Sequence, residues 1–183
     1  MSSEDELLIL VDELDREIGH LDKAACHDGE GVLHRAFSLF VFNRGGELLL
    51  QQRSAGKRLW PLFWSNSCCS HPRRGEAMAA AVRRRLLQEL GMTADLRHLF
   101  TFQYHARFGE AGSERELCWV WAGLSDDAVS PNPHEIADCQ WIAPDALDRD
   151  LAAKPHEFTP WFLLEWPVVR EWYRQALGTG SGI

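Results

Sequence analysis

The stretch SHPRRGEAMAAAVRRRLLQELGM, residues 70–92, decides the fold of this chain. Its part GEAMAAAVRRRLLQELG is rich in Ala, Arg and Leu, which favour helices, and Gly91 is typical of a helix C-terminal cap. Val82, Leu86 and Leu90 recur at four-residue steps and therefore share one face. The pattern predicts an amphipathic helix whose apolar stripe packs on a core.

Strands are predicted on both sides of this helix. RAFSLFVFN and ELLLQQR, joined by the turn signal NRGG, predict a hairpin. LFTFQYHARF and ERELCWVWAGL predict two further strands, DCQWIAPDAL a short strand and a helix start, and ELLILVDELDREIG a strand that turns through Asp12–Asp15. FTPWFLLEW predicts a last helix with Thr159 as N-cap and Pro160 at its first position, and Pro167 is expected to break or kink it. With no repeat and no linker, the chain reads as one mixed α/β domain.

The composition bounds the class of protein. A chain of 183 residues is long enough for one domain with a real core. Its net charge of −8 argues against nucleic-acid binding by bulk electrostatics, and no apolar run approaches the roughly 18 residues of a membrane span. The acidic start MSSEDELLIL is unlike a secretion signal, and the five cysteines fit no zinc-finger spacing. We therefore expect a cytoplasmic protein with reduced thiols.

Positive charge gathers in one window of this acidic chain. A local basic field suits a small anionic ligand such as a phosphate, and a solvated basic helix face is the alternative. The window contains Arg53, Lys57, Arg58, Arg73, Arg74, Arg83, Arg84 and Arg85.

Histidines and carboxylates form a candidate metal site. Glu114 and Glu116 stand at i and i+2 of a predicted strand, so they project to one face, where their like charges repel unless a cation lies between them. With His27, His34 and His71 they make up to five ligands, which fits five- or six-coordinate Mn²⁺, with Zn²⁺ or Fe²⁺ as alternatives. The other five of the eight histidines are scattered, so spacing alone leaves plain structural roles open.

The loop-like run WPLFWSNSCCSHP, residues 60–72, places a thiol two residues before an imidazole. Without disulfide chemistry, Cys68 and Cys69 are free for another use. A small buried packing role is the alternative for such a thiol.

The opening stretch resembles the Nudix box, a strand–loop–helix motif that binds divalent metal and cleaves nucleoside diphosphate linkages. Three positions depart from that pattern: Ser70 replaces a Gly, Arg85 the first paired Glu, and Gln88 one of the two metal-gripping Glu residues. Glu89 is kept. A hydrolytic site needs clustered carboxylates to hold Mg²⁺ and activate water. We therefore expect the scaffold to hold a diphosphate and to perform another reaction.

Further motifs make the resemblance more specific. AACH…LHRAF, KRLWPLFWSNSCCSHP, RRRLLQELG, FQYHARF, ERELC and FTPWF resemble, in order, those of the type I isopentenyl-diphosphate delta-isomerases, a metal-dependent Nudix-fold family. The resemblance implies an α/β (α+β) fold with a mixed β-sheet sandwiched between helices, as a single domain over residues 1–183 with flexible segments 1–5 and 178–183. It also implies isomerisation of isopentenyl to dimethylallyl diphosphate in isoprenoid biosynthesis. The expected partner is that small diphosphate, with no nucleic acid, no membrane, and a monomer or weak homodimer.

The same resemblance implies roles for individual residues. Cys69 and Glu116 match the catalytic acid/base groups, with Tyr104 as the hydrogen-bonding partner of Glu116. Glu89 matches the carboxylate that holds Mg²⁺ on the substrate diphosphate. The implied ligands of a Mn²⁺ (or Zn²⁺) ion are His27, His34, His71, Glu114 and Glu116. The implied substrate-binding residues are the cations Lys23, Arg53, Lys57 and Arg85, which would neutralise the diphosphate, and Trp161 beside the hydrocarbon.

The chemistry of the implied reaction agrees with these residue types. Protonation of an unactivated alkene creates a tertiary carbocation that water would capture, so the site must be dry, and a desolvated indole face such as Trp161 stabilises a cation by roughly 2 kcal/mol. Donor and acceptor act at different carbons, so two proton-transfer groups on opposite faces are needed. One alternative is a Nudix diphosphate hydrolase, which would not need Cys69. Another is a non-catalytic Nudix-like binding module, which would not assemble Cys69, Tyr104 and Trp161 together.

Overall fold

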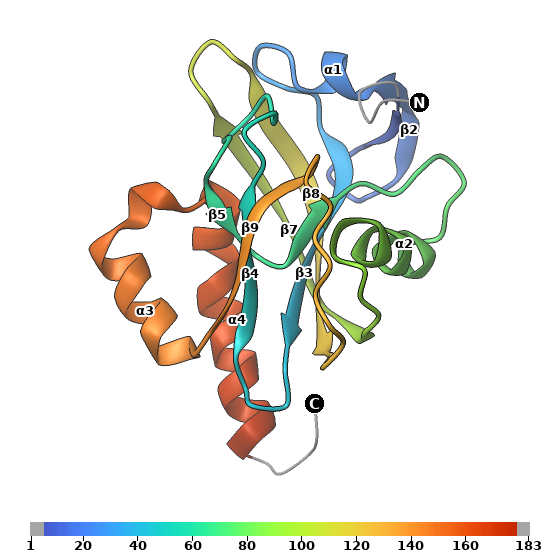
Figure 1. Ribbon diagram of the computed structural model, residues 1–183. Helices are drawn as coiled ribbons and strands as arrows, with labels where there is room; N and C mark the ends of the chain where they lie inside the picture. Colours follow the sequence, from blue (N-terminus) through green and yellow to red (C-terminus); the bar gives the residue numbers. More distant parts are fainter. Residues whose placement is uncertain (1–5, 179–183) are drawn as a thin grey trace.

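The structure, a computed structural model, describes residues 6–178, and its framework is a mixed β-sheet (Figure 1). The strands are β1 Leu7–Val11, β2 Glu17–Asp22, β3 His34–Phe42, β4 Leu48–Arg53, β5 Trp64–Ser65, β6 Cys68–Ser70, β7 Asp95–Arg107, β8 Ser113–Leu124 and β9 Ile136–Ile142. The helices are α1 Lys23–Cys26, α2 Met78–Leu90, α3 Pro144–Ala153, the short 3-10 helix η2 Pro155–Glu157 and α4 Pro160–Gly178.

The centre of the sheet is the parallel pair β3–β8, which joins segments about 80 residues apart in the chain. Strand β3 also pairs antiparallel with β1, β4 and β6, while β7 lies on the far side of β8. Of the nine residues of β3, Arg35 alone is not buried. Such a run is typical of a strand covered on both faces.

Helices cover the two faces of the sheet, as predicted. Alternate residues of β3 such as Leu39 pack in one apolar cluster with Leu86 of α2. The intervening residues, such as Phe40, pack in a second cluster with Phe162 and Trp166 of α4. Figure 1 shows α2 on one side of the sheet and α3 and α4 on the other. The fold is therefore a mixed β-sheet sandwiched between helices.

The helix predicted within residues 70–92 ends where expected, but it begins later than predicted. Gly91 caps α2 in the left-handed conformation with φ 66°, and its N–H bonds to the Leu87 carbonyl. The helix begins at Met78 rather than at Gly75, because Gly75 has φ 72° and the preceding turn is closed by a bond from the Arg73 N–H to the Glu76 carboxylate. That φ is incompatible with a right-handed helix.

Helix α4 corrects one prediction. The sequence predicts a break or a kink at Pro167, and the break does not occur, because the helix runs from Pro160 to Gly178 without interruption. Trp166 before the proline and Val169 after it are buried in the same apolar cluster. Burial on both sides outweighs the one backbone hydrogen bond that proline removes.

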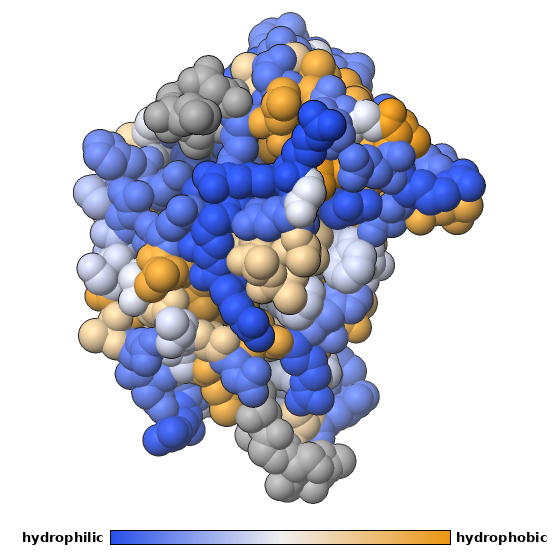
Figure 2. Space-filling view, turned by 90° about the vertical axis from the view of Figure 1, so that its right-hand side faces the viewer, coloured by the Kyte–Doolittle hydropathy of each residue, from blue (hydrophilic) through white to orange (hydrophobic). Residues whose placement is uncertain are grey.

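The expected flexible segments 1–5 and 178–183 lie outside the described residues, except that Gly178 still belongs to α4. No helix among residues 6–178 is long and apolar enough to cross a membrane. The face that carries α2 is predominantly hydrophilic, with hydrophobic residues in separate groups (Figure 2).

Candidate active site

Strand register builds the first part of the site. Tyr104 of β7 lies opposite Glu116 of β8, which in turn lies opposite His34 of β3. Residues in register point to the same face of a sheet. Accordingly Tyr104 Oη donates a hydrogen bond to Glu116 Oε2 at 2.7 Å, and Glu116 Oε1 lies 3.6 Å from His34 Nε2. The sheet thus presents a hydroxyl, a carboxylate and an imidazole in one row.

Three more side chains complete a buried cluster around this row. Glu114 lies two residues before Glu116, His27 follows α1, and His71 follows β6. In the cluster of His27, His34, His71, Glu114 and Glu116, one ligand atom from each residue lies within 4.8 Å of all the others. Ligand bonds of about 2.2 Å place opposite donors of one ion about 4.4 Å apart. The cluster therefore has the dimensions of a single metal site.

The unpaired atoms of the cluster also fit a metal. His27 Nε2 and Glu114 Oε2 approach to 2.8 Å, yet both are buried and neither has a hydrogen-bond partner of acceptable geometry among the described residues. Leaving buried polar atoms unpaired is costly unless another ligand completes them. Two buried carboxylates on one strand need a cation for the same reason. The donor set of three imidazoles and two carboxylates fits a divalent transition-metal ion.

Cys69 reaches the same face from the short strand β6. It lies opposite Ser38 of β3, whereas Cys68 points to the α2 side and is buried in that apolar cluster. Cys69 Sγ lies 2.8 Å from Asn66 Oδ1 and 3.2 Å from Trp161 Nε1. Burial raises the pKa of the Cys69 thiol to about 12, and Glu165 adds to this effect at the high pH at which its carboxyl group is ionised. The sulfur is therefore protonated at rest.

The pKa values of Glu116 and Tyr104 shift in opposite directions. Burial by itself would raise the pKa of Glu116, but the hydrogen bonds from His34 and Tyr104 lower it. Burial and the neighbouring Glu116 charge raise the pKa of Tyr104 well above its ordinary value. Tyr104 is therefore a hydrogen-bond donor to the Glu116 carboxylate.

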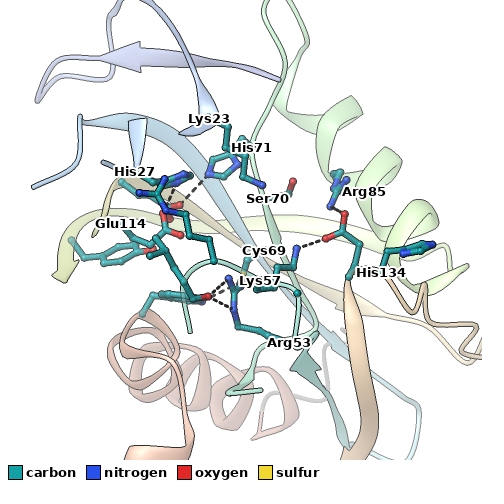
Figure 3. A pocket seen from close by; sticks show the side chains of 17 residues that line it. Lys23, His27, Arg53, Lys57, Cys69, Ser70, His71, Arg85, Glu114 and His134 are labelled. Carbon is teal, nitrogen blue, oxygen red and sulfur yellow. Dashed lines mark hydrogen bonds and ion pairs between the residues drawn. The ribbon is translucent and has the colours of Figure 1, made fainter. Parts of the chain in front are cut away.

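A cavity of about 520 Å³ joins these groups (Figure 3). His27, His71 and Glu114 lie together on one side, Cys69 and Lys57 lie near the centre, and Arg85 lies on the opposite side. The predicted site residues that line the cavity are Lys23, His27, Arg53, Lys57, Cys69, His71, Arg85, Tyr104, Glu114, Glu116 and Trp161.

Aromatic rings enclose the Trp161 end of the cavity. Trp161 is only 3 % exposed, meets Trp60 edge-on with ring centroids 5.3 Å apart, and has the Arg53 guanidinium carbon 5.2 Å from its own centroid. An indole in this position both packs and presents π density beside the thiol.

The basic end contains carboxylates as well as cations. Glu89 is buried in an ion pair with Arg85 and is not among the described side chains that line the cavity. Glu135, which the sequence did not single out, does line it and pairs with both Lys57 and Arg85. Burial would raise the pKa of Glu135, but these two cations lower it to about 2. Lys57 and Arg85 are thus held in place by a carboxylate before any anion binds.

Comparisons with known proteins identify the family. The NUDIX domain family model matches residues 32–162. The chain is 44 % identical over 173 residues to the isopentenyl-diphosphate Delta-isomerase of Burkholderia multivorans, covering 92 % of this chain and 98 % of that protein. It is 40 % identical over 170 residues to the isopentenyl-diphosphate Delta-isomerase of Nocardia farcinica, covering 92 % and 97 %.

Solved structures show the same fold. A crystal structure from Deinococcus radiodurans matches with a TM-score of 0.66 and 27 % identity, covering 81 % of this chain and 90 % of that chain. A MutT protein from Methanosarcina mazei, at 16 % identity, matches in fold alone with a TM-score of 0.57, covering 81 % and 96 %. The sheet between helices, the match over residues 32–162 and the close similarity to named isomerases along nearly the whole chain show that this protein belongs to the Nudix family and, within it, to the isopentenyl-diphosphate Delta-isomerases.

Proposed function

We propose that this protein is an enzyme that isomerises isopentenyl diphosphate to dimethylallyl diphosphate through a tertiary carbocation. One observation supports this most directly: a single cavity contains the Cys69 thiol, the Tyr104–Glu116 pair and a basic end. A reaction that adds a proton at one carbon and removes one from another needs two separate proton-transfer groups in one dry pocket.

Cys69 and Glu116 are the proposed proton-transfer groups. In one half of the reaction one of them gives its proton to a terminal alkene carbon, and the positive charge develops on the adjacent tertiary carbon. In the other half the second group removes a proton from the neighbouring CH₂, and the electron pair of that C–H bond forms the new double bond. Trp161, 3 % exposed, excludes water and stabilises the positive carbon between the two steps.

The metal and the diphosphate occupy distinct places in this proposal. His27, His34, His71, Glu114 and Glu116 would hold a Mn²⁺ (or Zn²⁺) ion, which sets the proton affinity of the Glu116 carboxyl group. The cations Lys23, Arg53, Lys57 and Arg85 line the cavity and would neutralise the diphosphate. Glu89 remains the proposed Mg²⁺ ligand, and its ion pair with Arg85 would have to loosen when Mg²⁺ and the diphosphate enter.

The runner-up function, hydrolysis of a diphosphate, is less well supported. Arg85 and Gln88 occupy two positions that are Glu in the Nudix box, and the described Glu89 is neutralised by Arg85. Clustered free carboxylates that would activate water are therefore missing from this part of the helix.

Proton NMR of isopentenyl diphosphate incubated with the enzyme in D₂O tests the proposal. Isomerisation gives dimethylallyl diphosphate with deuterium at the carbons that exchange protons with the enzyme. Release of phosphate or pyrophosphate without deuterium uptake into carbon would support the hydrolase and contradict the proposal.

The cellular location and the oligomeric state are also proposals. We infer a cytoplasmic location, which the five free cysteines of the described chain support, because thiols persist in reducing compartments. We also infer a monomer or weak homodimer, which sedimentation of the purified protein measures.

A further inference from the structure

A buried carboxyl group lies behind the thiol and has no part in the mechanism above. Glu165 lies on α4, one turn after Trp161, and its side chain is 0 % exposed. Its Oε2 atom is buried and has no hydrogen-bond partner within residues 6–178. An uncompensated carboxylate in such a place is strongly disfavoured, so the position calls for a physical explanation.

Glu165 is connected to Cys69 by two small polar side chains. Cys118 Sγ lies 3.5 Å from Glu165 Oε1 and 3.4 Å from Ser38 Oγ, and Ser38 Oγ lies 3.8 Å from Cys69 Sγ. Strand register produces this arrangement, because Ser38 is opposite Cys69 across β3–β6. Helix α4 therefore approaches the thiol twice, directly through Trp161 and indirectly through Glu165.

The protonation state of Glu165 decides where the protons of this chain point. Burial raises the pKa of Glu165 to about 8, so the carboxyl group is mostly neutral at pH 7. A carboxylate would accept the Cys118 and Ser38 protons and turn them away from the Cys69 sulfur. A neutral carboxyl group instead donates its own proton, which leaves the single Ser38 proton available for the sulfur.

We propose that Glu165 is a positioning residue for Cys69: as a neutral carboxyl group it donates a hydrogen bond into the Cys118–Ser38 pair, and the Ser38 hydroxyl is thereby directed at the sulfur. This inference rests on the proposed isomerase function. In each turnover the sulfur passes between thiol and thiolate, and the thiolate state is stabilised by hydrogen-bond donors. Trp161 Nε1–H is one donor, 3.2 Å from the sulfur, and Ser38 supplies a second from 3.8 Å, while no proton leaves Glu165 in the process.

Two substitutions of Glu165 separate this role from packing. Glu165→Gln keeps the shape and an N–H donor and never ionises, whereas Glu165→Met keeps a similar volume without a donor. We expect steady-state rates of dimethylallyl diphosphate formation to show kcat of the Gln variant within about 3-fold of wild type. For the Met variant we expect kcat to fall to about one-tenth of the wild-type value or below, because one hydrogen bond to a charged group is lost. We expect its KM to stay within about 2-fold of wild type.

Matched variants make the result specific. Val169→Ala removes two methyl groups from a fully buried side chain of the same helix, so it should lower the unfolding temperature while kcat is unchanged. Ser38→Ala breaks the next link, so it should lower kcat about as much as Glu165→Met, and the double variant should lose little more than either. Ser38→Ala also serves as the test if the Met variant does not fold.

Three results would overturn the inference. They are a wild-type kcat in Glu165→Met, an equal loss of kcat in the Gln and Met variants, or a loss of kcat in the Ser38→Ala/Glu165→Met double variant that equals the product of the two single losses. An inactive wild-type protein in the same series would instead contradict the proposed function itself. The two failures are therefore distinguishable.

Discussion

Cys69 and Glu116 face one cavity from two different strands, and the neighbours of each determine its protonation state. The thiol is protonated at rest, while Tyr104 and His34 favour the charged form of Glu116. In the proposed mechanism, such a pair would begin a turnover with one acid and one base already in the required protonation states.

Removal of either group should nearly abolish turnover. We expect Cys69→Ala and Glu116→Gln each to lower kcat by about 10³-fold, because general acid–base groups contribute roughly 10²–10⁴. Initial-rate assays of the two five-carbon diphosphates measure this. Cys139→Ala is the matched control, because Cys139 is also a partly buried free thiol but lies on β9 outside the cavity lining of the described residues. Normal turnover in either active-site variant would refute the assigned roles.

Substitutions of Trp161 test whether the π density of its ring or only its bulk contributes to activity beside the proposed carbocation. Trp161→Phe should retain more activity than Trp161→Leu, because a ring face survives and contributes roughly 1 kcal/mol or more to a desolvated cation. Both variants lose the N–H contact to the Cys69 sulfur, so the difference between them isolates the ring. Equal kcat in the two variants would favour simple packing.

Sequence patterns anticipated those parts of the site that depend on local spacing. The alternation that put Glu114 and Glu116 on one face is confirmed, since both are buried in the cluster. Pairings such as β3–β8 join distant segments and cannot be read from periodicity, so the convergence of the ligands rested on the family resemblance. Glu135 and Glu165 were missed because a single carboxylate in a loop or an apolar helix gives no repeating signal.

The turn between β7 and β8 positions His27, a proposed metal ligand. Gly112 has φ 136°, a Cβ added there would collide with the His27 carbonyl oxygen, and the next N–H, that of Ser113, bonds to the same oxygen at 2.9 Å. Gly112→Ala should therefore displace His27 and weaken metal binding about 10-fold or more. Metal titration by calorimetry measures this. Gly109→Ala is the control, because Gly109 also has a positive φ but has open space around it; equal losses in both variants would contradict the prediction.

Metal binding should couple the site to the stability of the whole fold. The ligands come from the α1 loop, β3, the end of β6 and β8, so one ion would tie four segments together. We expect a chelator to abolish activity and lower the unfolding temperature, and Mn²⁺ or Mg²⁺ to restore both, since a ligand that binds only the folded state stabilises it. Full activity in protein shown to be metal-free would contradict the metal site.

The buried Glu165 should give the folded protein a characteristic pH dependence. Its ordinary pKa of 4.5 rises to about 8 in the folded state, so between these values the folded chain binds more protons than the unfolded chain. The free energy of unfolding therefore falls as pH rises through this window, by at most about 1.4 kcal/mol per pH unit, and levels off above it. Glu165→Gln removes this contribution, so urea unfolding from pH 5 to 9 should show wild type losing stability relative to the variant as pH rises. Glu171→Gln, at an exposed carboxylate of the same helix, should follow wild type, and parallel curves for wild type and Glu165→Gln would show that Glu165 is ionised in the folded protein.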